Sequence, residues 1–179
     1  MKAIIKKIVF TLVLAVLPSM IFAQSAFEKF ADQDDVTSVV VNKKMFEMMS
    51  KVKVDTSDKQ TQGYISLLKK LDNLKVYTTT SAKPASEMRA SVASYLKSNP
   101  LEELMRVNDN GKNVKIYVKS GATSSQIKEL LMYIEGGNGK GNETVLMSLT
   151  GNFDLDEISA LTEKMKLPGG ESLKKASQK

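Results

Sequence analysis

The side chains that could do chemistry in this sequence are carboxylates, lysines, serines and methionines, because the chain contains no histidine and no cysteine. Their absence removes the serine–histidine and cysteine–histidine pairs of many hydrolases, together with the usual zinc ligands. A catalyst made from this chain would have to work with carboxylates, lysine or tyrosine.

Carboxylates gather in two places, which are Asp32, Asp34 and Asp35, and then Asp154, Asp156 and Glu157. Paired acids can cleave glycosides, and clustered acids can bind calcium. The first group lies in a polar stretch ahead of a strand-like run. The second coincides with a helix start, where Asp154 and Glu157 have the spacing of a capping box and acids favour the helix dipole. Solvation and capping are therefore the favoured interpretations.

Serine and lysine occur together in an arrangement that faintly resembles the penicillin-binding enzymes. Ser66 and Lys69 have Ser-x-x-Lys spacing on a predicted helix, and Lys119-Ser120-Gly121 follows a strand. The same spacing starts at five serines of this lysine-rich chain: Ser50, Ser66, Ser94, Ser125 and Ser172. Those enzymes also need a much larger domain, so the pattern is background.

Methionines cluster at Met45, Met48 and Met49. Exported copper-handling proteins use such thioether ligands. Together with Val52, however, the three methionines have the i, i+3, i+4, i+7 spacing of one helical face, and Phe46 lies among them. Methionine is an adaptable core residue, so the sequence favours ordinary core.

The stretch "EGGNGKGNET", residues 135–144, holds four glycines and a lysine and could be a phosphate loop or a turn. A phosphate loop needs a glycine five positions before Gly139, where the chain has Ile134, and a serine or threonine after Lys140, where it has Gly141. The glycine spacing does not fit a dinucleotide fingerprint either. Asn138-Gly139 between two apolar runs indicates a hairpin turn instead. We therefore predict no catalytic, cofactor-binding or metal-binding residues.

The N-terminus has the pattern of a secretory signal peptide: three lysines in residues 1–7, an apolar run over 8–17, and a small Ala23. The apolar run is shorter than the ~20 residues of a membrane span, so we expect a cleaved signal peptide. Because the sequence contains no cysteine, we expect no lipid anchor through an N-terminal cysteine. Removing residues 1–23 lowers the cationic residues from 26 to 23 against 20 acidic ones, so the net charge falls from +6 to +3. This modest charge does not favour nucleic-acid binding.

The periodicity of apolar residues predicts alternating strands and helices. Strands are expected at 36–41, 74–80, 101–107, 113–119 and 144–150, and helices at 43–52, 57–71, 84–96 and 154–165. The run 36–41 is rich in β-branched residues and is expected to be a buried strand. Residues 127–135 fit either state. These elements predict one α+β domain, in which an antiparallel sheet of about five or six strands carries three or four helices mostly on one face. The expected organisation is a signal peptide (1–23), this domain (24–166) and a flexible basic tail (167–179).

Two parts of the sequence resemble a known family: "NGKNVKIYVKSG" with the following "IKELLMYIEG", and "VLMSLTGNFDLDEI". Over residues 27–165 they are similar to the bacterial envelope proteins called domain of unknown function 4252. The resemblance implies a strand at 127–135, in a meander with its neighbours, and implies no catalytic residues. Many members carry a lipoprotein cysteine, which this chain lacks.

We therefore expect an exported, non-catalytic binding or scaffold protein of a Gram-negative envelope, in the periplasm or secreted. Its partner would be an envelope protein or an extracellular ligand. The alternative is a small carboxylate-dependent hydrolase that acts on an envelope or extracellular glycan or peptide.

Overall fold

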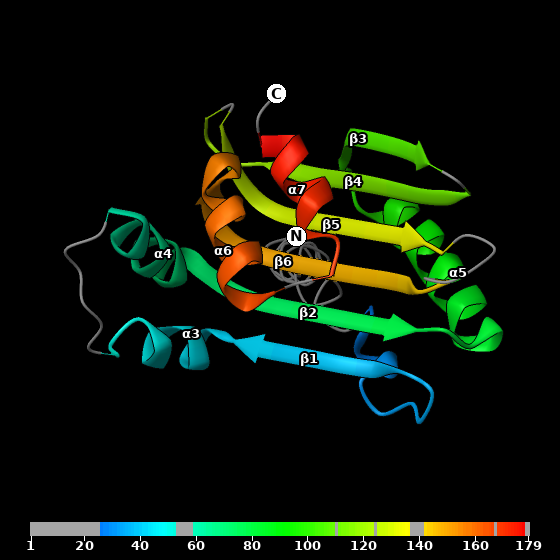
Figure 1. The fold of residues 1–179 in the computed structure, drawn as a ribbon. Helices are drawn as coiled ribbons and strands as arrows, with labels where there is room; N and C mark the ends of the chain where they lie inside the picture. Colours follow the sequence, from blue (N-terminus) through cyan, green and yellow to red (C-terminus); the bar gives the residue numbers. More distant parts are fainter. Residues whose placement is uncertain are drawn as a thin grey trace, which may run out of the picture.

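The computed structural model describes residues 26–52, 59–109, 111–123, 125–136, 142–166 and 168–177. Six strands form one antiparallel sheet in the order β1-β2-β6-β5-β4-β3 (Figure 1). The strands are β1 Thr37–Asn42, β2 Leu71–Thr79, β3 Glu102–Asp109, β4 Lys112–Ser120, β5 Gln126–Glu135 and β6 Thr144–Asp154. The prediction of an α+β domain with such a sheet is confirmed.

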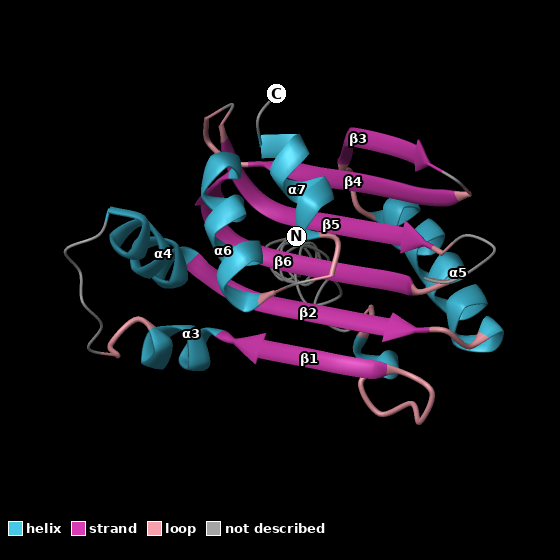
Figure 2. Ribbon diagram, in the orientation of Figure 1, coloured by secondary structure: helices cyan, strands magenta, loops and turns pink. Residues whose placement is uncertain are grey.

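Helices cover both faces of this sheet (Figure 2). They are the 3-10 helix η2 Glu28–Phe30, α3 Lys43–Met49, α4 Lys59–Lys70, α5 Ala82–Ser98, the 3-10 helix η3 Leu155–Glu157, α6 Ile158–Met165 and α7 Gly170–Ser177. α6 and α7 cross the front of the sheet, and α5 lies behind it. The apolar residues of α3, α4, α6 and α7 share one core, so most helices lie on one side, as predicted.

The larger core lies between the sheet and the helices α4, α6 and α7, on a side that we call the α6 face. The strand register aligns Val76, Met147, Met132 and Ile116 side by side on β2, β6, β5 and β4. All four are buried. Because neighbouring positions alternate between faces, the predicted alternation of β4 and β6 is confirmed.

The opposite side of the sheet, which we call the α5 face, is covered by η2 and α5. Tyr77, Leu146 and Tyr133 are aligned there on β2, β6 and β5. They pack with Phe27, Phe30 and the buried residues Met88, Val92 and Tyr95 of α5. The sheet is therefore buried on both faces, which explains the nearly continuous apolar sequences of β5 and β6.

The ambiguous stretch 127–135 is strand β5, and it forms a hairpin with β6 in which Ile134 pairs with Val145. The two strands approach closely at Gly136, where a Cβ atom would lie 2.6 Å from the main-chain carbonyl carbon of Asn142. Residues 137–141, on which the turn prediction falls, lie outside the described residues.

Three expectations differ from the structure. The run 36–41 was expected as a buried strand, but β1 is an edge strand whose Val39 and Val40 are 44% and 46% exposed. The predicted core face of α3 is also wrong, since Met45, Met48 and Val52 are exposed while Phe46 is fully buried. Asn42 caps α3 by accepting a hydrogen bond from the Met45 main-chain nitrogen at 3.0 Å, which fixes where the helix begins. The helix meets the core on one side only, and Phe46 lies on that side.

The third difference is at the C-terminus, where a flexible tail was expected over 167–179. Residues 170–177 form α7, and its Leu173 and Ala176 are buried in the core of the α6 face. These two residues are three positions apart, which places them on one side of the helix. With only two apolar contacts in a lysine-rich stretch, the periodic signal is too weak to see in the sequence.

Candidate functional site

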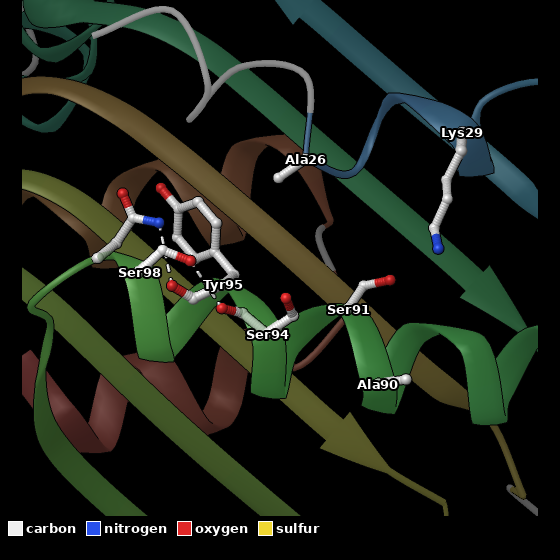
Figure 3. Close-up of a pocket in the computed structure, with 8 residues that line it drawn as sticks. Ala26, Lys29, Ala90, Ser91, Ser94, Tyr95 and Ser98 are labelled. Carbon is white, nitrogen blue, oxygen red and sulfur yellow. Dashed lines mark hydrogen bonds between the residues drawn. The ribbon is translucent and has the colours of Figure 1, made fainter. Parts of the chain in front are cut away.

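An open groove of about 680 Å³ lies on the α5 side of the molecule, between α5 and the N-terminal segment that contains η2 (Figure 3). Ala26 and Lys29 contribute one wall. The helix α5 contributes Ala90, Ser91, Ser94, Tyr95 and Ser98, and Asn99 follows at its end. Spacings of three and four residues place the α5 members on one side of the helix, so this wall is built almost entirely from small side chains.

The hydroxyl protons of this wall are largely committed to the helix itself. Ser91 donates to the Glu87 carbonyl at 2.8 Å and Ser98 donates to the Ser94 carbonyl at 2.9 Å. The Asn99 side-chain amide likewise donates to the Tyr95 carbonyl at 3.0 Å. The oxygens of Ser91 and Ser98 can therefore accept a hydrogen bond through their lone pairs, but neither hydroxyl is set up as a nucleophile.

The far side of Tyr95 contacts a buried carboxylate. Its hydroxyl donates to Glu129 Oε1 at 2.6 Å, and Glu129 is only 6% exposed on β5. Burial raises the pKa of Glu129, while the hydrogen bond from Tyr95 and the charge of Lys119 lower it. Burial, followed by the contact with Glu129, raises the pKa of Tyr95. Tyr95 thus separates a protonatable carboxyl from the groove.

A second buried polar group lies beside Glu129 in the sheet. Thr150 is the residue directly opposite Glu129 on β6. Its hydroxyl oxygen is buried and makes no hydrogen bond with any of the described residues. The α5 face therefore places a carboxyl and an unsatisfied hydroxyl beside each other beneath the C-terminal end of α5.

The N-terminal wall of the groove is held on the sheet by aromatic contacts and one ion pair. The Phe27 ring is 5.0 Å from that of Tyr95, and the Phe30 ring is 5.8 Å from that of Tyr77. Between them, Glu28 Oε2 contacts Nζ of the buried Lys75 at 2.5 Å. These contacts fix η2 against the sheet, so the groove is a preformed feature of the fold.

The carboxylates that the sequence singled out lie elsewhere. Asp32, Asp34 and Asp35 precede β1, separate from Asp154, Asp156 and Glu157, which border a cleft of about 530 Å³ together with Glu102. The predicted capping box is confirmed: the Asp154 main-chain nitrogen donates to Glu157 Oε2 at 2.9 Å, and the side chain of Asp154 caps in return. Lys70 Nζ lies 2.8 Å from Glu157 and 3.6 Å from Asp154. Two of these acids are therefore bound to structural partners.

The other sequence candidates are not brought together. Ser66 and Lys69 are exposed on α4, and Lys119 and Ser120 are exposed on β4. Of the methionines, Met45 and Met48 are exposed and Met49 packs against the core. Within the described parts of the chain, no three aspartate or glutamate residues are grouped so as to hold a metal ion.

Sequence reasoning missed the residues of the groove. A signal for the wall was present, because Ala90, Ser94 and Ser98 repeat at intervals of four along a predicted helix. A signal for Glu129 was present too. It is a charged residue in the apolar sequence of β5, and its position two residues before Leu131 and four before Tyr133 places it on their side of the strand. Neither signal identifies what lies opposite, which depends on how η2 folds back over α5.

Comparisons with known proteins place the chain in one family. No helix within the described residues is long and apolar enough to cross a membrane. No curated protein matches the sequence. Among solved structures, the Ran-binding protein Mog1p of Saccharomyces cerevisiae is similar at 12% identity, over 85% of this chain and 79% of that one; its TM-score of 0.34 supports no conclusion about this protein. Residues 27–161 match the family described as Domain of unknown function (DUF4252), and the chain belongs to that family.

Proposed function

We propose that this chain is an exported, non-catalytic binding protein of the bacterial envelope, and that it holds a short peptide segment of another envelope protein in the groove between η2 and α5. The export part of the proposal rests on the signal-like pattern of residues 1–23. The binding part rests on the groove, and above all on its wall of small side chains along α5.

The dimensions of the groove suit an extended peptide. From Ala90 to Ser98 the helix rises by about 12 Å, which matches about four residues of an extended chain. Alanine and serine let a main chain approach closely, and the serine oxygens can accept its N–H groups. Lys29 is the charged residue among the lining side chains, so it favours a peptide with an acidic side chain or a terminal carboxylate.

The same chemistry argues for recognition rather than turnover. The protons of Ser91 and Ser98 are donated to helix carbonyls, and Glu129 is buried behind Tyr95 rather than lining the groove. A nucleophile needs a base within hydrogen-bonding reach. The groove residues offer acceptors, a cation and a fixed shape, which are the components of a binding surface.

Two alanines on α5 provide a matched test. Ala90 lines the groove, whereas Ala93 is exposed on the same helix and is not one of the lining residues. In a fluorescence-anisotropy screen of labelled tetrapeptides against the full chain, Ala90→Arg should weaken binding roughly tenfold or more, because the long arginine side chain fills the Ala90 end of the groove and shortens the site. Ala93→Arg should leave binding unchanged. Equal losses in both variants, or no peptide bound by the parent, would refute the groove as the site.

One observation favours the hydrolase alternative. Asp156 and Glu102 border the cleft of about 530 Å³ together with the capping-box residues Asp154 and Glu157. Because Asp154 and Glu157 stabilise the helix start, their substitution would confound activity with stability. Asp156 is exposed, so Asp156→Asn is the informative variant. Turnover of a glycan or peptide panel that this substitution abolishes, with the thermal melt unchanged, would favour the hydrolase over the binding protein.

A further inference from the structure

The outer edge of β1 is an unprotected strand edge. β1 pairs with β2 on one side and ends the sheet on the other (Figure 1). Its six residues, TSVVVN, include no charged residue and no proline, and their register with β2 is regular throughout. Val39 and Val40 point to opposite faces, and both are nearly half exposed. Such an edge presents main-chain donors and acceptors to another strand.

The opposite edge of the sheet, β3, carries the protection that β1 lacks. Its register with β4 is interrupted between Glu103 and Met105. Glu103 and Arg106 form an ion pair along it, with the Arg106 Nε atom 2.9 Å from Glu103 Oε1. Bulges and charges are the usual means of blocking pairing with another chain. The fold therefore blocks one edge and leaves the other open.

We propose that β1 pairs antiparallel with β1 of a second copy of this chain, about a two-fold axis that lies midway between the Val40 residues of the two copies. A two-fold axis perpendicular to the sheet places the α5 faces of the two copies on the same side of the joined sheet. A residue of the α5 face must therefore lie opposite another residue of the α5 face, and the same holds for the α6 face. Faces alternate along a strand, so one residue of β1 must lie directly opposite the same residue of the other copy, with the axis between them.

The sequence of β1 selects Val40 as that residue. With the axis there, Val40 meets Val40, Val39 meets Val41, and Ser38 meets Asn42. With the axis at Val39, Val40 would instead face Ser38 and Val41 would face Thr37. β-Branched pairs directly across a ladder stabilise a sheet. Only the Val40 axis places every valine opposite a valine and every polar residue opposite a polar one.

Charges that flank β1 support the same orientation. Asp34 and Asp35 are exposed just before the strand, and Lys43 and Lys44 are exposed just after it. An antiparallel arrangement brings the acidic end of one copy beside the basic end of the other, twice per dimer, whereas a parallel arrangement would place like charges together. Lys43 already contacts Asp72 of its own chain at 2.9 Å, so Lys44 is the cation that contributes most across the interface.

Cysteine cross-linking tests both the dimer and its register, because an introduced cysteine is the sole thiol of the chain. In the proposed dimer, Val40→Cys faces itself at a Cβ separation of about 4.5–5.5 Å, with Cα atoms in the range of a disulfide. Val39→Cys is equally exposed, yet it lies diagonal to itself at about 7–8 Å. Leu104→Cys, 40% exposed on the β3 edge, is the control for random collision.

On mild oxidation of the full chain, Val40→Cys should give several times more covalent dimer than either control. Light scattering across a dilution series should show a dimer for the parent chain and a monomer for Val40→Lys, because the two lysines would face each other. Mixing Val40→Lys with Val40→Glu should restore the dimer in this register. Circular dichroism of each variant checks that it is folded.

Three results would overturn the proposal. A parent chain that is monomeric at every concentration leaves the edge to a strand from a different protein. A dimer that survives Val40→Lys is built on another surface. Equal cross-linking of Val39→Cys and Val40→Cys contradicts the register. Because Ala90 lies on α5, away from β1, the outcome is independent of the peptide-binding test.

Discussion

The two faces of the sheet are filled with different kinds of residue. On the α6 face the buried strand positions are aliphatic, methionine or phenylalanine, packed against Leu67, Ile158 and Leu161. The α5 face buries tyrosines together with Lys75 and Glu129. There, the hydroxyl of Tyr77 is buried without a hydrogen-bond partner among the described residues, and burial, with smaller effects of Glu28 and Asp32, raises its pKa to about 12.

This difference suggests that the α6 face serves mainly stability, whereas the α5 face, which lies beneath the groove, serves recognition as well. Burying a charge or an unpaired hydroxyl costs free energy that an aliphatic side chain would not cost. The α6 face avoids that cost, whereas the α5 face accepts it directly beneath the groove. We infer that the α6 face supplies most of the folding free energy, and that the α5 face is specified by its polar contacts as well as by packing.

The largest expected effect compares two leucines of β6 that point to opposite faces. Leu149 lies between Leu74 and Leu130 on the α6 face, and Leu146 lies between Tyr77 and Tyr133 on the α5 face. Each substitution by alanine should cost about 2–5 kcal/mol in the free energy of unfolding. Leu149→Ala should lie near the top of this range because its cavity is dry, whereas the tyrosine hydroxyls offer partners to water beside Leu146.

Urea denaturation of both variants, with m-values checked against the parent, measures that difference. A cost for Leu146→Ala equal to or above that for Leu149→Ala would contradict the proposed contrast between the faces.

A smaller effect concerns pH and Glu129. Because burial raises the folded-state pKa of Glu129 above its ordinary value of 4.5, the folded chain keeps this proton at pH values where the unfolded chain has lost it. The contribution of Glu129 to the free energy of unfolding therefore falls as the pH rises from about 4.5 through the folded pKa. Glu129→Gln should remove that contribution, so the variant should gain stability relative to the parent as the pH rises.

Tyr95→Phe should strengthen the pH-dependent loss of stability that Glu129→Gln removes. The Tyr95 hydroxyl lowers the pKa of Glu129 by donating to its carboxylate form. Without it, the pKa of Glu129 should rise further and the loss of stability should extend to higher pH. Unfolding free energies of the three proteins between about pH 5 and pH 8 decide the matter; parallel profiles for all three would show that Glu129 stays ionised.

The smallest effect compares two threonines of the α5 face. Thr79 donates from its hydroxyl to the Asp35 carbonyl at 2.7 Å and accepts from the Ser81 main-chain nitrogen at 3.0 Å. Thr79→Val should therefore cost about 1–3 kcal/mol. Thr150→Val removes a buried hydroxyl that has no partner among the described residues, so it should be neutral or stabilising by up to about 1 kcal/mol. A clear loss of stability in a thermal melt of Thr150→Val would mean that its hydroxyl is satisfied.

Local signals in the sequence predicted much of the fold. The alternation of Val114, Ile116 and Val118 predicts strand β4 and its inward face, and all three are buried. The capping-box spacing of Asp154 and Glu157 predicts a helix start, which the structure contains. Each signal depends on a few neighbouring residues, because strand and helix geometry fix which side chains share a face.

Features that depend on distant partners could not be predicted in the same way. The valines of β1 have the composition of a central strand, and only the strand order makes them an edge. Phe46 rather than the methionines faces inward on α3, because α3 meets the core on one side only. The groove likewise needs η2 and α5, whose contact through Phe27 and Tyr95 joins residues far apart in the sequence.

The strand order also determines when each strand can pair during translation. The meander from β3 to β6 joins neighbours in sequence, but β2 must wait for β6, since Thr79 pairs with Thr144, which comes 65 positions later. At about 5–20 residues per second, that gap corresponds to roughly 3–13 s of translation. During this interval β1 is the only sheet neighbour of β2 that has been made. The nascent chain therefore carries the apolar residues Leu71, Leu74, Val76 and Tyr77 of β2 without their β6 partners, and we expect this period to be when it depends most on chaperones.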